Sequence, residues 1–144
     1  MAANPMQILH VEDNPGDVLM TREALDVAGI PASVRIVTTG DEALDFLRRR
    51  GPYTREARPD LVILDLNLPV RSGKELLADM GNDPELCGII VAILTSSPND
   101  ADVCSCYDKT LCRYFQKRST FEGLVEVVKE IDAFWKLASR QGKY

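Results

Sequence analysis

Residues 61–64 form an unbroken run of four apolar residues that ends directly at a carboxylate, Asp65. A strand with one face in water alternates apolar and polar residues, whereas a short continuous run fits a strand buried on both faces. Pro69 and Gly73 follow the run closely and end the extended segment. The run therefore predicts a central strand of a covered sheet, with an aspartate at its carboxyl end.

Strand and helix patterns alternate along the whole chain. Short apolar runs predict five strands, over residues 6–11, 34–37, 61–64, 89–94 and 114–116. A helical pattern follows each strand, over residues 15–29, 39–50, 72–80, 99–110 and 121–138. This alternation predicts an α/β fold in which a doubly wound, five-stranded parallel sheet is covered by five helices.

The helix starts carry capping signals. Asn14 precedes Pro15, and proline suits the first helical position because the N–H group it lacks is not needed there. At three later starts a Ser or Thr is followed three residues on by Glu, which is the spacing of a capping box. These pairs are Thr39 and Glu42, Ser72 and Glu75, and Ser119 and Glu122.

Length and charge limit the classes of protein that fit. The chain has 144 residues, of which 45% are hydrophobic, without an internal repeat or linker, so a single domain over 1–144 is expected. A net charge of −5 disfavours binding to nucleic acid and to anionic membranes. No apolar run approaches the about 18 residues of a membrane span, and no secretory signal is recognisable. We therefore expect a cytoplasmic location.

The sequence contains four cysteines, Cys87, Cys104, Cys106 and Cys112. Their spacing lacks the paired C-x2-C of zinc sites. Without an export signal a disulfide framework is not expected, so the interpretation is reduced thiols packed in a helix and at a strand start, with a metal or redox role as the alternative.

Reactive side chains gather where the predicted strands end. The carboxyl ends of parallel strands meet at one edge of the sheet, which is where ligands bind in such folds. The residues at those ends are Glu12, Asp13, Asp65, Thr95, Ser96 and Lys117. Three crowded carboxylates repel one another unless a cation joins them, and oxygen ligands with open positions suit Mg²⁺. An aspartate can also act as a nucleophile and form an aspartyl phosphate.

Structural roles are the alternatives for these residues. Asp65 can serve as a turn residue, Thr95 as a loop cap and Lys117 as a surface charge, and Glu12 and Asp13 can line a solvated turn. A phosphohydrolase of the D-x-D type would need a second carboxylate where this chain has Asn67. A nucleotide-binding or flavin-binding module would need a glycine-rich phosphate loop, which the sequence lacks.

Four segments in order, VEDN at 11–14, DLNLP at 65–69, LTSS at 94–97 and YFQK at 114–117, resemble the receiver domain of response regulators in two-component signalling. Segments VEDNPGDV, RPDLVILDLNLP and LTSSPNDADV and the FW pair at 134–135 resemble the single-domain regulators paired with bacterial phytochromes. The resemblance implies a flavodoxin-like fold with strand order 2-1-3-4-5 and no output domain.

The resemblance also implies a role for each site residue. Asp65 matches the phosphoacceptor and also a Mg²⁺ ligand, and Asp13 matches a direct Mg²⁺ ligand. The backbone carbonyl of Asn67 and, through water, Glu12 complete the metal site. Four further residues match those that bind the phosphoryl group or switch with it: Thr95, Lys117, Tyr114 and Ser96. For Tyr114, ordinary core packing is compatible with that role. Arg118 departs from the family, which usually has proline after the lysine, so either a costly cis bond is kept or the loop differs.

The implied partners are a sensor histidine kinase, with a phytochrome as candidate, and in addition a histidine phosphotransfer protein. The implied reaction moves a phosphoryl group to Asp65 and changes an interaction surface, so the chain is not an enzyme for an outside substrate. The alternative is an interaction module that works without phosphorylation. His10 is the only histidine, and it is expected inside the first strand rather than as phosphodonor.

The last helix predicts more apolar surface than one contact needs. A stripe of helical spacing, which includes Leu124 and Ile131, is expected on the sheet. Additional apolar residues widen this stripe, and they predict a homodimer interface rather than scattered exposed residues. They are Val127, Phe134, Leu137 and Ala138.

Overall fold

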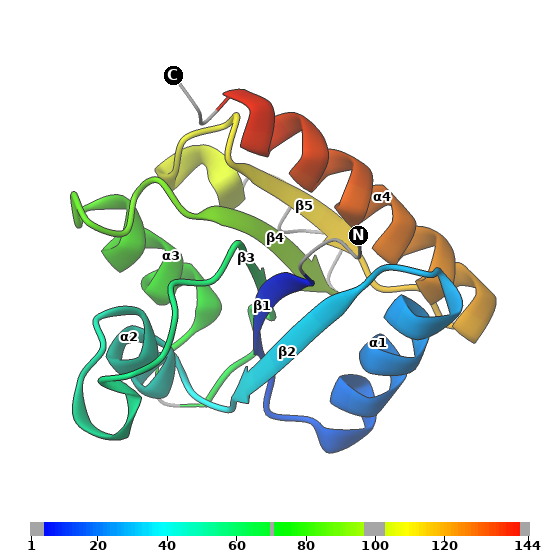
Figure 1. The fold of residues 1–144 in the computed structure, drawn as a ribbon, viewed down its shortest axis with the longest axis horizontal. Coiled ribbons are helices and arrows are strands. Elements are labelled where there is room, and N and C mark those ends of the chain that lie inside the picture. Colours follow the sequence, from blue (N-terminus) through cyan, green and yellow to red (C-terminus); the bar gives the residue numbers. More distant parts are fainter. Residues whose placement is uncertain (1–4, 70, 97–102, 142–144) are drawn as a thin grey trace.

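A computed structural model describes residues 5–69, 71–96 and 103–141 and contains a five-stranded sheet in the order β2-β1-β3-β4-β5 (Figure 1). All neighbouring strands are parallel. The strands are β1 (Met6–Val11), β2 (Ala32–Val37), β3 (Leu61–Leu64), β4 (Ile90–Thr95) and β5 (Cys112–Gln116). The helices are α1 (Pro15–Val27), α2 (Gly40–Leu47), α3 (Gly73–Gly81) and α4 (Phe121–Gln141), with short 3-10 turns η1 (Gly51–Tyr53) and η3 (Val103–Cys106). The predicted sheet and strand order are confirmed.

Helices cover both faces of the sheet, as Figure 1 shows. One core joins the sheet to α2, α3 and η3, and the other joins it to α1 and α4. Every residue of β3 and β4 is buried, which explains their continuous apolar sequences. The edge strands expose polar side chains instead, namely Arg35 on β2 and Arg113 and Gln116 on β5. The apolar run before Asp65 is therefore the middle of the sheet.

Three helix starts are capped as predicted. Asn14, Thr39 and Ser72 accept hydrogen bonds from the backbone N–H groups three residues on, at 3.1, 3.0 and 3.2 Å. The fourth prediction, a box of Ser119 and Glu122, is wrong by one residue. Since α4 begins at Phe121, Thr120 occupies the cap, and its hydroxyl accepts from the N–H of Gly123 at 3.0 Å.

The predicted helix over 99–110 is not an α-helix in its described part, so four α-helices lie in the described residues rather than five. Residues 97–102 lie outside the described parts. The turn η3 ends at Cys106, and the Asp108 side chain then accepts hydrogen bonds from the N–H and hydroxyl of Thr110, at 2.9 and 2.8 Å. This local turn competes with helix formation.

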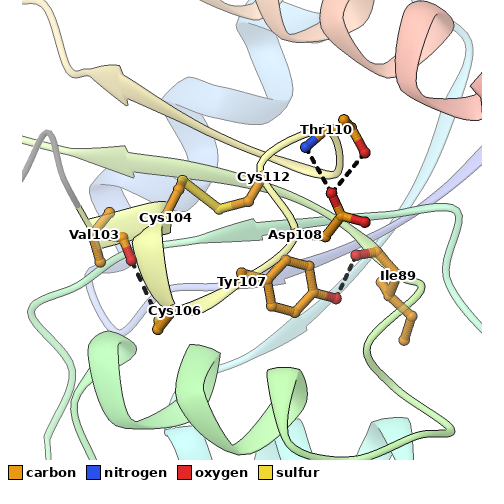
Figure 2. Close-up of a disulfide and its surroundings, with 8 residues drawn as sticks. All are labelled: Ile89, Val103, Cys104, Cys106, Tyr107, Asp108, Thr110 and Cys112. Atoms are coloured by element: carbon orange, nitrogen blue, oxygen red, sulfur yellow. Dashed lines mark hydrogen bonds between the residues drawn. A yellow bond between two sulfur atoms is a disulfide. The ribbon is translucent and has the colours of Figure 1, made fainter.

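The expectation that all cysteines are reduced is wrong for one pair. Cys104 in η3 and Cys112 at the start of β5 form a disulfide, with their Cα atoms 5.7 Å apart (Figure 2). Cys87 and Cys106 are free and exposed. The pair forms because η3 folds back against the beginning of β5, and the spacing of cysteines in the sequence does not show that proximity.

Helix α4 packs along the sheet with more of its surface than predicted. Val127, Phe134 and Ala138 are buried, and the Phe134 ring lies 6.0 Å from that of Phe115 on β5. The prediction that these three residues lie on a free face is therefore wrong, because the stripe that contacts the sheet is wide enough to include them. Of the four proposed interface residues only Leu137 is exposed, at 56%.

The indole N–H of Trp135 donates a hydrogen bond to the carbonyl of Asp60 at 3.0 Å, which fixes α4 beside the residue that precedes β3. Within the described residues no helix combines the length and the apolar character that crossing a membrane requires.

Candidate functional site

The carboxyl ends of β1 and β3 bring three carboxylates together. Glu12 and Asp13 follow β1, and Asp65 follows β3, its parallel neighbour. One oxygen of each residue lies within 4.8 Å of the others. Glu12 and Asp65 are buried, whereas Asp13 is exposed. The predicted cluster is therefore formed, with one side open to solvent.

Backbone hydrogen bonds hold two of these residues rigidly. The N–H of Glu12 donates to the Val37 carbonyl at 3.0 Å, and that of Asp65 donates to the Val11 carbonyl at 3.1 Å. The sheet ladder thus continues one residue beyond each strand. A Cβ on Gly73 would lie 2.5 Å from the Asp65 carbonyl oxygen, so α3 starts in direct contact with this backbone. Packing thereby fixes where the Asp65 carboxylate lies.

Lys117, which follows β5, completes the cluster. Its Nζ lies 2.8 Å from Glu12, 3.0 Å from Asp17 and 3.8 Å from Asp65. Its backbone N–H donates to the Thr95 carbonyl at 2.7 Å. Burial alone would lower the pKa of Lys117, but the hydrogen bonds to Glu12 and Asp17 and the charge of Asp65 outweigh it and raise the pKa. The ammonium group therefore stays charged between acidic groups.

Burial raises the pKa of Glu12 to about 7, and the neighbouring Asp65 carboxyl adds to the rise while Lys117 opposes it. Burial and the crowding of acidic groups thus disfavour the charged form of Glu12. A cation at the open side of the cluster would offset this effect. The oxygen donors of Glu12, Asp13 and Asp65 are the type that Mg²⁺ and similar ions prefer.

The remaining candidates surround the cluster. Thr95 is fully buried at the end of β4, and Ser96 next to it is exposed. Asn67 is exposed, and its N–H donates to the Asp65 carboxylate at 3.3 Å. Tyr114 is half-buried on β5 and packs against the core that includes α2 and α3. Thr95, Ser96 and Asn67 lie at or near the edge at which the parallel strands end. Tyr114 lies two residues before the end of β5.

The sequence analysis missed Asp17, which contacts Lys117 from the first turn of α1. The available signal was the helix start at Pro15, because a helix that begins just after β1 places its first turn beside the strand ends. The structure also places His10 inside β1 as predicted, 1% exposed, with its Nδ1 lacking a partner among the described residues.

The peptide bond after Lys117 differs from the cis bond that usually precedes a proline at this position, since Arg118 follows the lysine here. None of the described peptide bonds is cis, so Lys117 and Arg118 are joined in trans. The Arg118 guanidinium lies 3.5 Å from Glu126 and 3.6 Å from Glu130 on α4. Arg118 therefore turns toward the last helix, and Lys117 nevertheless reaches the carboxylates.

The fold and the acidic cluster define a receiver domain, which is a signalling module rather than a conventional enzyme. Residues 8–129 match the family model described as the response regulator receiver domain, and the chain belongs to this family.

The chain is similar to the response regulator Rcp1 of Synechocystis, with 37% identity over 91% of this chain and 89% of that protein. Among solved structures it is similar to the phosphorylated cyanobacterial phytochrome response regulator RcpA, with 38% identity, a TM-score of 0.82, and 92% and 95% of the two chains covered. It is also similar to the Mn²⁺-bound form of Rcp1, with 35% identity, a TM-score of 0.79, and 91% and 94% covered.

Proposed function

We propose that this chain is a phosphorylation switch in which Asp65 accepts a phosphoryl group from the phosphohistidine of a sensor histidine kinase, in a reaction that depends on Mg²⁺. The observation that carries the proposal is the Asp65 carboxylate, fixed at the end of a buried strand among two other carboxylates and 3.8 Å from an ammonium group. A relative whose crystal structure is described as phosphorylated supports it.

The donor set fits a hard divalent cation. Asp13 is the open carboxylate and Asp65 lies beside it, so we assign both as direct ligands, with the backbone carbonyl of Asn67 and, through water, Glu12. When bound, Mg²⁺ would offset the negative charge of the phosphoryl group. The similar protein Rcp1 has been crystallised in a Mn²⁺-bound form, which supports binding of a divalent cation.

The residues divide the work of the transfer. One oxygen of Asp65 attacks phosphorus, the bond from phosphorus to the histidine nitrogen breaks, and the kinase imidazole keeps the electron pair and takes up a proton. Lys117 pairs with phosphoryl oxygens, and the hydroxyl of Thr95 donates a hydrogen bond to one of them. The small side chain of Ser96 leaves the open side of the site accessible.

The added charge, about −1.5 to −2, provides the signal. Thr95 and Tyr114 lie on adjacent strands, so movement of Thr95 toward the phosphoryl group leaves room for the Tyr114 ring to follow. We propose that this change alters the surface around η3 and β5. We propose that the signal leaves through contacts of this surface with other proteins in the cytoplasm.

The relatives guide the choice of partners. Because RcpA and Rcp1 resemble this chain over most of its length, a phytochrome is the first kinase to test, and a histidine phosphotransfer protein is a candidate acceptor. A homodimer through α4 is kept as a proposal that centres on exposed Leu137. A Leu137→Glu variant that keeps the mass of the wild type in light scattering would exclude that residue from an interface.

The test is intact-mass spectrometry after incubation with acetyl phosphate, with and without Mg²⁺. We expect wild type to gain one phosphoryl group only with Mg²⁺, and Asp65→Asn to gain none. Asp45→Asn, which removes an exposed carboxylate on α2, is the matched control and behaves as wild type.

A phosphoryl group on Asp65→Asn would show that the acceptor is wrong. If wild type gains none, incubation with a phosphorylated phytochrome kinase decides the matter. Failure there as well would support the alternative, an interaction module that works without phosphorylation.

A further inference from the structure

We propose that the Cys104–Cys112 pair is a reversible thiol–disulfide modification site, whose state controls how freely the connection from η3 to β5 moves. The reagent that would change its state is a thiol and the corresponding disulfide, such as reduced and oxidised glutathione. The effect on signalling rests on the proposed phosphorylation switch, whereas the modification itself does not.

The disulfide is poorly placed to stabilise the fold. It joins two residues that are only 8 positions apart in the sequence. A cross-link stabilises a fold mainly by restricting the unfolded chain, and this effect is smallest for short loops. The segment between the two cysteines is already held by other contacts. The Tyr107 hydroxyl donates to the Ile89 carbonyl at 2.6 Å (Figure 2). It also lies 3.0 Å from the Leu86 carbonyl, and burial raises the pKa of Tyr107, so the hydroxyl keeps its proton.

Those contacts do not involve either sulfur atom of the pair. The Asp108 side chain holds the turn through Thr110, and the carbonyl of Cys106 lies so close to α3 that a Cβ on Gly81 would approach it to 2.8 Å. We therefore expect η3 and the start of β5 to stay together after reduction, with the two thiols still adjacent. Adjacent thiols in a folded segment can be reoxidised without unfolding the protein.

The two sulfur atoms differ in access. Cys104 is half-buried and Cys112 is 4% exposed, so an incoming thiolate meets Cys104 first. It bonds to the Cys104 sulfur as the S–S bond breaks, and Cys112 leaves as a thiolate and takes up a proton. A second thiol then attacks the mixed disulfide and releases Cys104. Two protein thiols and one disulfide of the reductant result, so the reductant is oxidised by two electrons.

The disulfide lies at the end of β5 that is far from the carboxylate cluster. It is therefore placed to affect the surface formed by η3 and β5 rather than the phosphoryl transfer itself. Cys112 begins β5 opposite Val91, and Thr95 pairs with Gln116 at the other end of the strand. Four residues of strand separate these ends by roughly 13 Å. Tyr114 lies between them, two residues after the disulfide. The cross-link thus ties β5, near its switch residue, to the segment η3.

The first test equilibrates folded wild type in glutathione buffers of increasing oxidised fraction, followed by alkylation and mass spectrometry. We expect Cys104 and Cys112 to lose alkylation together, at a lower oxidised fraction than Cys87 and Cys106, whose exposed thiols form only mixed disulfides with glutathione. The protein concentration is kept low enough to leave the chain monomeric. In Cys104→Ser, Cys112 has no internal partner. We expect it to form at most a mixed disulfide with glutathione, which a reductant removes. Cys106→Ser is the matched control, since this exposed thiol belongs to the same turn but forms no disulfide.

Two results would overturn the modification site. One is full alkylation of both cysteines in the folded protein under oxidised glutathione. The other is a pair that is reduced only after urea unfolds the chain, which would make the disulfide structural. The wild-type measurement decides even if a variant fails to fold.

The second test measures hydrogen exchange over 103–116 before and after phosphorylation with acetyl phosphate and Mg²⁺. We expect both redox forms to take up one phosphoryl group, and the change in exchange to be smaller in the disulfide form. Equal changes in both forms would overturn the coupling to the switch. If neither form is phosphorylated, the proposed function and this coupling fail together, whereas the alkylation result stands on its own.

Discussion

The ammonium group of Lys117 and the carboxylate of Asp17 lie 3.0 Å apart, although the two residues are 100 positions apart in the sequence. The pair joins the segment after β5 to the first turn of α1. Lys117 at the same time contacts Glu12 at 2.8 Å but lies beyond hydrogen-bond distance of Asp65, at 3.8 Å. Asp17 therefore helps to hold the lysine to one side of the proposed phosphoacceptor.

Asp17→Asn is expected to weaken Mg²⁺ binding. The released Lys117 ammonium can approach Asp65 and repel the cation, and one acidic charge near the cluster is lost. Because Asp17 is partly exposed, we expect a change of about two- to fivefold in the dissociation constant, as for other solvent-screened ion pairs. Calorimetric titration with Mg²⁺ measures it. Asp26→Asn on the same helix is the control, and unchanged affinity in both variants would contradict the role of Asp17.

Gly73→Ala is expected to destabilise the fold and to slow phosphorylation. The new Cβ would lie 2.5 Å from the Asp65 carbonyl oxygen and 2.7 Å from the Cα of Leu66, so the backbone that positions Asp65 must shift. Overpacking of this kind costs about 1–3 kcal/mol of unfolding free energy. Urea unfolding provides the value. Gly88→Ala, whose Cβ would meet only an arginine side chain at 3.5 Å, should match wild type, and equal effects would refute the close contact.

Phe134→Ala is expected to lower the free energy of unfolding by about 3–5 kcal/mol, as is usual for a large aromatic side chain removed from a core. Phe134 is 3% exposed and packs against Phe115 beneath the Arg113 guanidinium, 4.9 Å from the ring centre. Leu137→Ala, three residues on, should change the same quantity by less than about 0.5 kcal/mol because that side chain is exposed. Similar losses for both variants in urea unfolding would show that α4 is rotated from the position described.

His10→Leu is expected to abolish a loss of stability that wild type undergoes on acidification. Burial lowers the pKa of His10 from 6.5 to about 4, so the unfolded chain binds the proton more tightly than the folded chain does. The contribution of neutral His10 to the free energy of unfolding is therefore fully present above pH 6.5 and is lost as the pH falls toward 4. It amounts to on the order of 3 kcal/mol.

Glu12 acts in the opposite direction, because its raised pKa favours the folded state at low pH and this advantage is lost as the pH rises toward 7. The comparison with His10→Leu cancels that effect. Urea unfolding of both proteins from pH 7.5 to 4.5 should show the curves diverge, with wild type losing more on acidification. Parallel curves would mean that the pKa of His10 is the same in the folded and the unfolded chain.

Local signals in the sequence were enough to predict the sheet and most of the cluster. The apolar run before Asp65 and the proline after Asn14 act over a few residues, so strand β3 and the start of α1 matched their predictions. Since parallel strands end at one edge, Glu12, Asp65 and Lys117 followed from the fold alone.

Long-range contacts account for what was missed. The Asp17 contact depends on the rotation of α1, the disulfide depends on how η3 folds back, and the burial of Phe134 depends on how widely α4 contacts the sheet. The sequence indicates that α1 begins at Pro15 and that α4 carries an apolar stripe, but it does not show which side chains of other elements these helices contact. The shift of the last cap from Ser119 to Thr120 shows the usual uncertainty of one residue in locating a helix end.

The hydrogen bond from Trp135 to the Asp60 carbonyl determines which part of the fold tryptophan fluorescence reports on. The only tryptophan of the chain lies beside the amino end of β3, at the opposite end of that strand from Asp65. Its fluorescence should follow the docking of α4 during unfolding and should change little when a cation enters the carboxylate cluster. Emission therefore provides a stability assay that can be run at any Mg²⁺ concentration, and quenching by added metal would indicate a change transmitted through the whole sheet.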